Sequence, residues 1–375
     1  MKDKLAELPI SIQKDFNATL VLAYPLCILL SYKQYYPWYM EHYIQPWGIE
    51  CSNHWTDIDM VDTLQNGYAS GTFNRLLDVT PISYDMSRNI SDIVSFLKEQ
   101  IDNQRYVVLF IDDYYINGYR HFLHEHLIYG YNDSLKMFKS VNFKVSGTFS
   151  SVVLDYEMLE NGFNNATDLY LERSDLLWLR SQAIVLFGRT SMEKVYPYSV
   201  SRIVRRLTDY ASSRISSEED YYLNFSNKSI LNVVYGINVN NIVVKHLYNA
   251  MEYDTDADYN QIHLLYEQKK AINMRLQYLK SHLQENVVIE DEVMQYQQIE
   301  DAMNRIRMKL LKLRVKKTVN SEYKDSLSQI MHATQVMHAK EKEIMQDLLD
   351  KLISVESRRN DDYTNSSRYD DRLHA

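Results

Sequence analysis

Hydrophobic and polar positions divide the chain into a part with mixed periodicity and a last third with helical periodicity. Residues 106–111 read Tyr-Val-Val-Leu-Phe-Ile, apolar on both faces, which predicts a central strand. Residues 126–131 and 136–143 predict two further strands around a turn at 132–134. An amphipathic helix at 88–101, with Asn89 or Ser91 as its cap, precedes them. This order is typical of an α+β unit with an antiparallel sheet.

Apolar positions between residues 18 and 45 also recur at helical spacing, and they are interrupted by Pro25 and Pro37. Because proline is tolerated in a first helical turn, we expect two short helices, each beginning near one proline. Further along the chain we predict a strand at 150–155, helices at 155–161, 200–214 and 237–250, and a strand or buried helix within 170–187.

From residue 257 onward, apolar residues follow the spacing of helices that pack along one face, with Lys269 as the exception. Breaks near 285–289 and 318–320 separate three such stretches, which predicts a compact up-down-up bundle. The polar and acidic tail is predicted to be disordered. The predicted divisions are a papain-like domain at 1–155, a mixed α/β continuation at 156–255, a three-helix bundle at 256–357 and the tail at 358–375.

Composition narrows the class of protein. The net charge is −9 and the pI is about 5.7, which argues against a nucleic-acid-binding protein, and the basic run at 305–317 lies on a predicted helix. Two cysteines are too few for a disulfide framework, and no apolar stretch reaches the length of a membrane span. We therefore expect a cytoplasmic protein without membrane contact. No phosphate-binding or dinucleotide-binding motif is present in the sequence, so no cofactor is predicted.

His126 and Asn142 form the candidate pair with mechanistic content. Hairpin strands with a turn near 132–135 would place them side by side. In a thiol-dependent enzyme, the imidazole would act as the base and the amide would accept its N–H and fix its tautomer. The alternative is a packing or hydrogen-bonded histidine in a strand, while an asparagine inside Val141-Asn142-Phe143 is otherwise awkward because a buried amide needs partners.

The candidate nucleophile is Cys27. In the first turn of a helix its thiolate would be favoured, whereas burial among its apolar neighbours would raise the pKa of its thiol. Cys51 lies in a more polar segment without a helix start and ranks below it. A further alternative is a metal site formed by His121, His124 and His126, with Asp112 and Asp113 as conceivable partners, but our prediction is that the chain binds no metal.

The chain resembles the butirosin biosynthesis protein H family, whose N-terminal domain is related to papain-like cysteine peptidases, including the bacteriocin-processing domains of peptide exporters. The resembling residues cover most of the chain: 24–31, 37–45, 107–116, 126–133, 235–239, 267–270 and 275–276. The resemblance implies a papain-like domain followed by a helical region. It also implies an acyltransferase of secondary-metabolite biosynthesis, of the aminoglycoside or nonribosomal peptide type.

In that family chemistry, a cysteine thiolate attacks an acyl-carrier or peptidyl-carrier thioester, and a histidine, here His126, shuttles protons. A carrier protein or a nonribosomal peptide synthetase is then the expected partner. By the family pattern the nucleophile belongs at positions 25–27, where this chain has Pro25 and places Cys27 two residues later. Such a shift turns a helical side chain by about 200°. The alternative function is therefore a catalytically inactive scaffold or binding protein of the same architecture.

Overall fold

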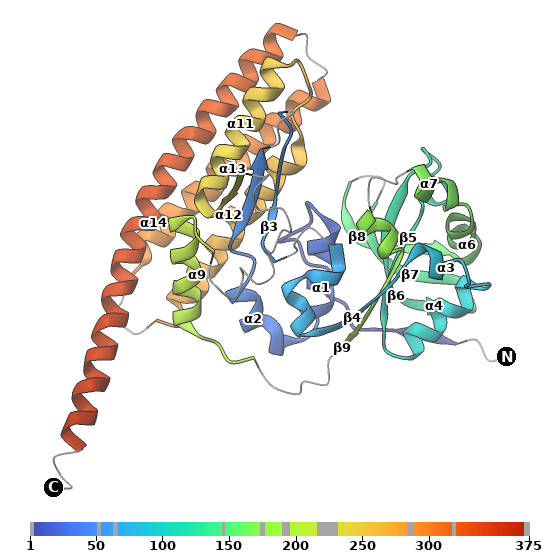
Figure 1. Ribbon diagram of the computed structural model, residues 1–375, viewed down its shortest axis with the longest axis horizontal. Coiled ribbons are helices and arrows are strands. Elements are labelled where there is room, and N and C mark those ends of the chain that lie inside the picture. Colours follow the sequence, from blue (N-terminus) through green and yellow to red (C-terminus); the bar gives the residue numbers. More distant parts are fainter. Residues whose placement is uncertain are drawn as a thin grey trace. The chain divides into compact units, whose positions relative to one another are not determined.

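The computed structural model shows a mixed α+β protein with antiparallel sheets, which confirms the fold class at that level (Figure 1). The chain folds into two compact units, neither of which is continuous in sequence. Unit 1 comprises Met1–Tyr36 and Asp62–Tyr196, and unit 2 comprises Pro37–Val61 and Pro197–Ala375. The predicted divisions at residues 155 and 255 do not coincide with these limits. The structure describes residues 4–50, 54–62, 67–144, 147–172, 177–189, 196–215, 232–283, 288–316 and 320–370.

The described residues of unit 1 form a seven-stranded antiparallel sheet in the order β4-β9-β5-β6-β7-β8, and β1 also pairs with β6. The strands predicted at 106–111, 126–131, 136–143 and 150–155 are confirmed as β5 to β8. All seven residues of β5 are buried, as expected of a central strand that is apolar on both faces. The strands are β1 (Leu5–Glu7), β4 (Leu77–Ile82), β5 (Tyr106–Asp112), β6 (Leu123–Asn132), β7 (Met137–Phe143), β8 (Phe149–Asp155) and β9 (Ile184–Arg189).

Helices lie on both faces of this sheet (Figure 1). Helix α6 packs closely on β5 because position 162 is a glycine: a Cβ there would lie only 3.0 Å from the carbonyl oxygen of Asp112. Helix α4 is capped by the Asp92 side chain, which accepts from the Ser95 N–H at 2.8 Å, and not by the predicted Ser91 or Asn89. The helices are α1 (Leu20–Leu29), α3 (Tyr84–Ser87), α4 (Ile93–Asp102), α5 (Tyr114–Asn117), α6 (Tyr156–Asn164), α7 (Thr167–Glu172) and α8 (Leu177–Ser181).

The start of α1 differs from the prediction. The helix begins at Leu20 and carries Pro25 in its interior, so Cys27 lies in the last turn. The five residues from Leu20 to Tyr24 are mostly buried, and packing of this apolar segment offsets the cost of an interior proline, which is about 3 kcal/mol. The second prediction was right: α2 (Tyr36–Glu41) has Pro37 in its first turn.

The described residues of unit 2 combine a three-stranded antiparallel sheet, in the order β10-β2-β3, with a set of helices. The three predicted C-terminal helices are present, with α12 packed on α13 and α13 on α14, and α9 and α11 also pack on α14 (Figure 1). Helix α14 continues to Asp370, over part of the segment predicted to be disordered. The elements are β2 (Pro46–Glu50), β3 (Thr56–Met60), β10 (Asn232–Tyr235), α9 (Val200–Ser212), α11 (Val239–Glu252), α12 (Tyr259–Lys280), α13 (Glu290–Lys316) and α14 (Asn320–Asp370).

A buried ion pair explains why Lys269 interrupts the apolar pattern of α12. Its ammonium lies 2.9 Å from the Glu341 carboxylate, and both side chains are completely buried. The Glu341 carboxylate also accepts hydrogen bonds from the Tyr210 hydroxyl at 2.6 Å and the Tyr296 hydroxyl at 2.5 Å. The network therefore links α9, α12, α13 and α14 inside unit 2. None of the helices in the described part of the chain combines the length and apolar character needed to cross a membrane.

Candidate functional site in unit 1

Cys27 lies in an environment that keeps its thiol protonated. Its side chain is fully buried in α1, and burial raises the pKa of the thiol to about 12. The last turn of a helix carries partial negative charge, which disfavours a thiolate, whereas the predicted first-turn position would have favoured it. Among the described residues, the interactions of Cys27 involve Ser11, Gln13 and Tyr24, and none involves His126.

His126 faces the side of the sheet that carries α6. Directly opposed residues of antiparallel strands point to the same face, and His124 opposes Ile111 while His126 opposes Leu109. Ile111 lies under Gly162 of α6, because a Cβ at position 162 would lie 3.4 Å from the Ile111 Cβ. His124 and His126 therefore share the α6 face.

Helix α1 covers the opposite face. Tyr24 of α1 stacks on Phe149 with a ring-centroid distance of 6.3 Å. Phe149 opposes Phe143 in the β7–β8 pair, and Asn142, the residue before Phe143, therefore points to the other face. The sheet thus lies between Cys27 and the His126–Asn142 pair. The predicted assembly of Cys27, His126 and Asn142 into one catalytic group is wrong for this geometry.

The predicted adjacency of His126 and Asn142 is present, but the role of the amide differs. The Asn142 Oδ1 accepts from the Phe143 N–H at 2.7 Å and its Nδ2 donates to the Glu125 carbonyl at 3.0 Å, which fixes the amide orientation. The amide therefore presents its NH2 group, not the predicted oxygen, to His126. Its Nδ2 lies 2.9 Å from Nδ1 and 3.2 Å from Nε2 of that ring.

One N–H cannot align with both ring nitrogens, because their lone pairs diverge, and the shorter contact is the one to Nδ1. Asn142 is a buried amide whose own groups are paired with the backbone of β6 and β7. It does not hold His126 in the way that a thiol-dependent enzyme requires.

The partner of His126 is Asp113, at the turn between β5 and α5. The His126 Nε2 lies 3.2 Å from the Asp113 Oδ1, and both residues are buried. Burial opposes ionisation of Asp113, but its hydrogen bond to His126 and the nearby imidazoles outweigh this, so its pKa lies below the ordinary value. The sequence alone assigns Asp113 no such pairing, because it depends on how the turn after β5 folds back over β6.

His124 completes this cluster, and His121 does not belong to it. The donor atoms of Asp113, His124 and His126 all lie within 4.8 Å of one another. Burial, followed by the neighbouring His126, lowers the pKa of His124 to about 4. His121 instead pairs with Asp112 at 2.6 Å, and its side chain is largely exposed. Two histidines and a carboxylate therefore replace the three-histidine grouping that the sequence suggests.

A cavity of about 570 Å³ opens over the cluster. Its volume lies within the range of small-molecule sites. Besides the three clustered residues, it is lined by Ile116, Asn117, Tyr119, Asn142, Phe143, Lys144, Val152, Val153 and Leu154.

Glu125 is a residue that no sequence motif singles out. It alternates with His124 and His126 along β6, so its side chain points to the α1 face, and the Tyr24 hydroxyl donates to its carbonyl at 2.9 Å. Burial raises the pKa of its carboxyl group to about 7. The β6 side chain that points toward α1, the helix that contains Cys27, is therefore Glu125 and not His126.

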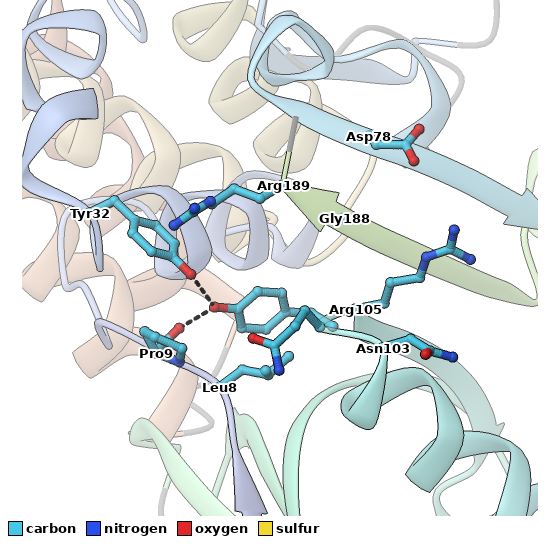
Figure 2. Close-up of a pocket in the computed structure, with 10 residues that line it drawn as sticks. Leu8, Pro9, Tyr32, Asp78, Asn103, Arg105, Gly188 and Arg189 are labelled. Carbon is cyan, nitrogen blue, oxygen red and sulfur yellow. Dashed lines mark hydrogen bonds between the residues drawn. The ribbon is translucent and has the colours of Figure 1, made fainter. Parts of the chain in front are cut away.

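A second cavity in unit 1, of about 510 Å³, lies where β4, β5 and β9 meet the segments after β1 and α1 (Figure 2). The Tyr32 and Tyr106 hydroxyls meet at 3.3 Å, and Tyr106 donates to the Pro9 carbonyl. The Arg189 guanidinium lies over the Tyr32 ring, 4.7 Å from its centroid. Within the described chain, neither Arg189 nor Arg105, which also lines this cavity, pairs with a carboxylate.

Comparisons with known proteins do not identify a family for this chain. No protein-family model matches the chain. No curated protein matches it either.

Proposed function

We propose that this chain is a binding or scaffold protein of papain-like architecture that does not use thiol catalysis. The observation that carries the proposal is the placement of Cys27 and His126 on opposite faces of the unit 1 sheet. Since no imidazole among the described residues contacts the sulfur, the deprotonation step of thiol-dependent acyl transfer has no base there.

The raised pKa of Cys27 supports the same conclusion. With a pKa of about 12, the thiol is protonated in nearly all molecules at pH 7.5. Working thiol enzymes lower this pKa to between about 3.5 and 7.5, so that much of the thiol is ionised. Because Cys27 is also fully buried, the minor thiolate form cannot reach a substrate without local unfolding.

The resemblance to the butirosin biosynthesis protein H family suggests the pathway and the partner. In this proposal the chain acts in secondary-metabolite biosynthesis and binds an acyl-carrier or peptidyl-carrier protein, or the synthetase that contains one. The second cavity is lined by Arg105, Arg189 and the Asp78 carboxylate, and the two guanidinium groups lie on opposite sides of it (Figure 2). Arg189, which has no carboxylate partner in the described chain, supports capture of an anionic group, since a guanidinium favours a carboxylate or phosphate.

Thiol labelling of the full chain tests the proposal. A Cys51→Ser variant leaves Cys27 as the single thiol, and iodoacetamide labelling at pH 7.5 is followed by intact-mass spectrometry. We expect no labelling of the folded protein over a time in which the guanidinium-denatured protein is fully labelled. The same measurement on Cys51→Ser with Cys27→Ala provides the background.

One result would overturn the proposal: rapid labelling of Cys27 in the folded protein that disappears in His126→Ala. That result would restore the acyltransferase function. Binding to the partner is measured separately, by titrating the full chain with acyl-carrier and peptidyl-carrier domains, and absence of binding to both kinds would contradict the proposed partner.

A further inference from the structure

We infer that Asp113, His124 and His126 form a binding site for a divalent transition-metal ion of the zinc type. The three side chains come from two neighbouring segments of unit 1. His124 and His126 are two residues apart on one face of β6, and Asp113 follows the end of β5, the strand that pairs with β6. Among the residues that the structure describes, this is the one group of three such donors within mutual reach.

The spacing of the donors fits a metal ion. Zinc binds imidazole nitrogen and carboxylate oxygen at about 2.0–2.2 Å, so tetrahedral ligand atoms lie roughly 3.3 Å from each other. The Asp113 Oδ1 and the His126 Nε2 are 3.2 Å apart, and all three donors lie within 4.8 Å. The Asn142 Nδ2 lies 3.2 Å from the same His126 Nε2 and 3.4 Å from the His124 Nδ1, so binding of the ion displaces this amide from the two rings.

The surroundings hold Asp113 in the required position. Its second carboxylate oxygen accepts from the Asn117 Nδ2, which leaves Oδ1 toward His126. The Tyr119 N–H donates to the Asn117 Oδ1 at 3.0 Å and fixes the orientation of that amide. The Asp113 N–H donates to the Phe122 carbonyl at 2.9 Å. Such partners of a ligating carboxylate are a regular feature of protein metal sites.

The cavity of about 570 Å³ over the cluster gives access from solvent. Three protein ligands leave one tetrahedral position for water or for a donor atom of a bound molecule, which distinguishes this arrangement from a closed structural site with four protein ligands. Two histidines and one carboxylate also suit iron(II). The inference therefore covers transition metals that accept imidazole ligands, such as zinc and iron(II), and not calcium or magnesium, which prefer oxygen ligands.

Metal titration of the full chain tests the inference. Protein carrying Cys51→Ser, which removes one competing thiol, is stripped with EDTA and titrated with Zn²⁺ by calorimetry at pH 7.5. Cobalt(II) absorption provides a second readout, because its visible spectrum reports ligand number. We expect binding of one ion, weakened about 10- to 100-fold by Asn117→Ala and at least as much by His124→Ala.

His121→Ala is the matched control, since His121 is an exposed neighbour outside the cluster, and it is expected to leave the affinity unchanged. Circular dichroism verifies that each variant is folded; Asn117 and His124 are chosen because neither is fully buried. No zinc binding by the parent protein, or equal affinity in His124→Ala, would overturn the inference. So would a loss in His121→Ala as large as that in His124→Ala.

Discussion

Replacement of Glu125 by glutamine should make unit 1 more stable at alkaline pH and leave it nearly unchanged at acidic pH. Burial raises the pKa of Glu125 from 4.5 to about 7 in the folded protein. The folded state therefore binds more protons than the unfolded state between these two values, and stability falls as pH rises through this window. Below about pH 4.5 the carboxyl group is protonated in both states, so it does not change the free energy of unfolding.

The magnitude follows from the pKa difference. Each pKa unit corresponds to about 1.4 kcal/mol, which sets an upper value near 3 kcal/mol for Glu125 at pH 8. Because the side chain keeps some contact with solvent, we expect about 1–3 kcal/mol. For a unit of this size, each kcal/mol shifts the midpoint of thermal unfolding by about 2–4 °C.

The assay is thermal and urea unfolding of the parent protein and Glu125→Gln at pH 5 and pH 8, followed by circular dichroism. Glu99→Gln is the control, because Glu99 is an exposed carboxylate in α4 of the same unit. The stabilisation by Glu125→Gln should be about four times larger at pH 8 than at pH 5, where the unfolded state has only begun to lose the proton. An equal effect at both pH values, or destabilisation at pH 8, would refute the assignment of a buried, raised-pKa carboxyl group at this position.

Three other predictions concern buried or charged polar groups. Lys269→Met should destabilise unit 2 by about 3–5 kcal/mol in urea unfolding, because it leaves Glu341 buried without its cation, and a double variant with Glu341→Leu should recover most of this loss. Asn142→Ala should cost about 1–3 kcal/mol in unfolding experiments by leaving strand groups unpaired, without changing the labelling of Cys27. Arg189→Ala should weaken the binding of inorganic pyrophosphate, measured by calorimetry, about tenfold or more, whereas a surface control, Arg120→Ala, should not.

Four strands of the unit 1 sheet, β5 to β8, were predictable because they carry strong local signals, whereas the sequence does not predict β1 and β4 and fits either a strand or a buried helix in the β9 region. The run at 106–111 is continuously apolar and β-branched or aromatic, and it forms the fully buried β5. His126 lies beside Asn142 as expected, but the turn alone does not set this contact. The turn pairs Asn132 with Met137, and only the register shift between Ile128 and Gly130 brings His126 and Asn142 onto the same face, since the unshifted register would oppose His126 to Phe143.

The face of the sheet on which α1 packs was not predictable in the same way. A shift of one residue along β6 exchanges Glu125 for His126 on the side toward α1, and no local pattern distinguishes the two cases. The start of α1 was missed because a proline usually marks a helix beginning, whereas the apolar residues before Pro25 extend the helix to Leu20. The expectation that Cys27 contacts His126 rested on both errors, the face of the sheet and the start of the helix.

Unit 2 has a consequence for the order of events during synthesis. Its strand β2 lies between β3 and β10, yet β10 leaves the ribosome roughly 180 residues after β2. At translation rates of about 5–20 residues per second, the β2–β3 hairpin lacks its third strand, β10, for about 10–40 s, and the edge of β2 is unpaired during this time. Helix α11, which packs on this hairpin, follows β10. A nascent chain in this interval presents an unpaired strand edge that chaperones or a second copy could bind.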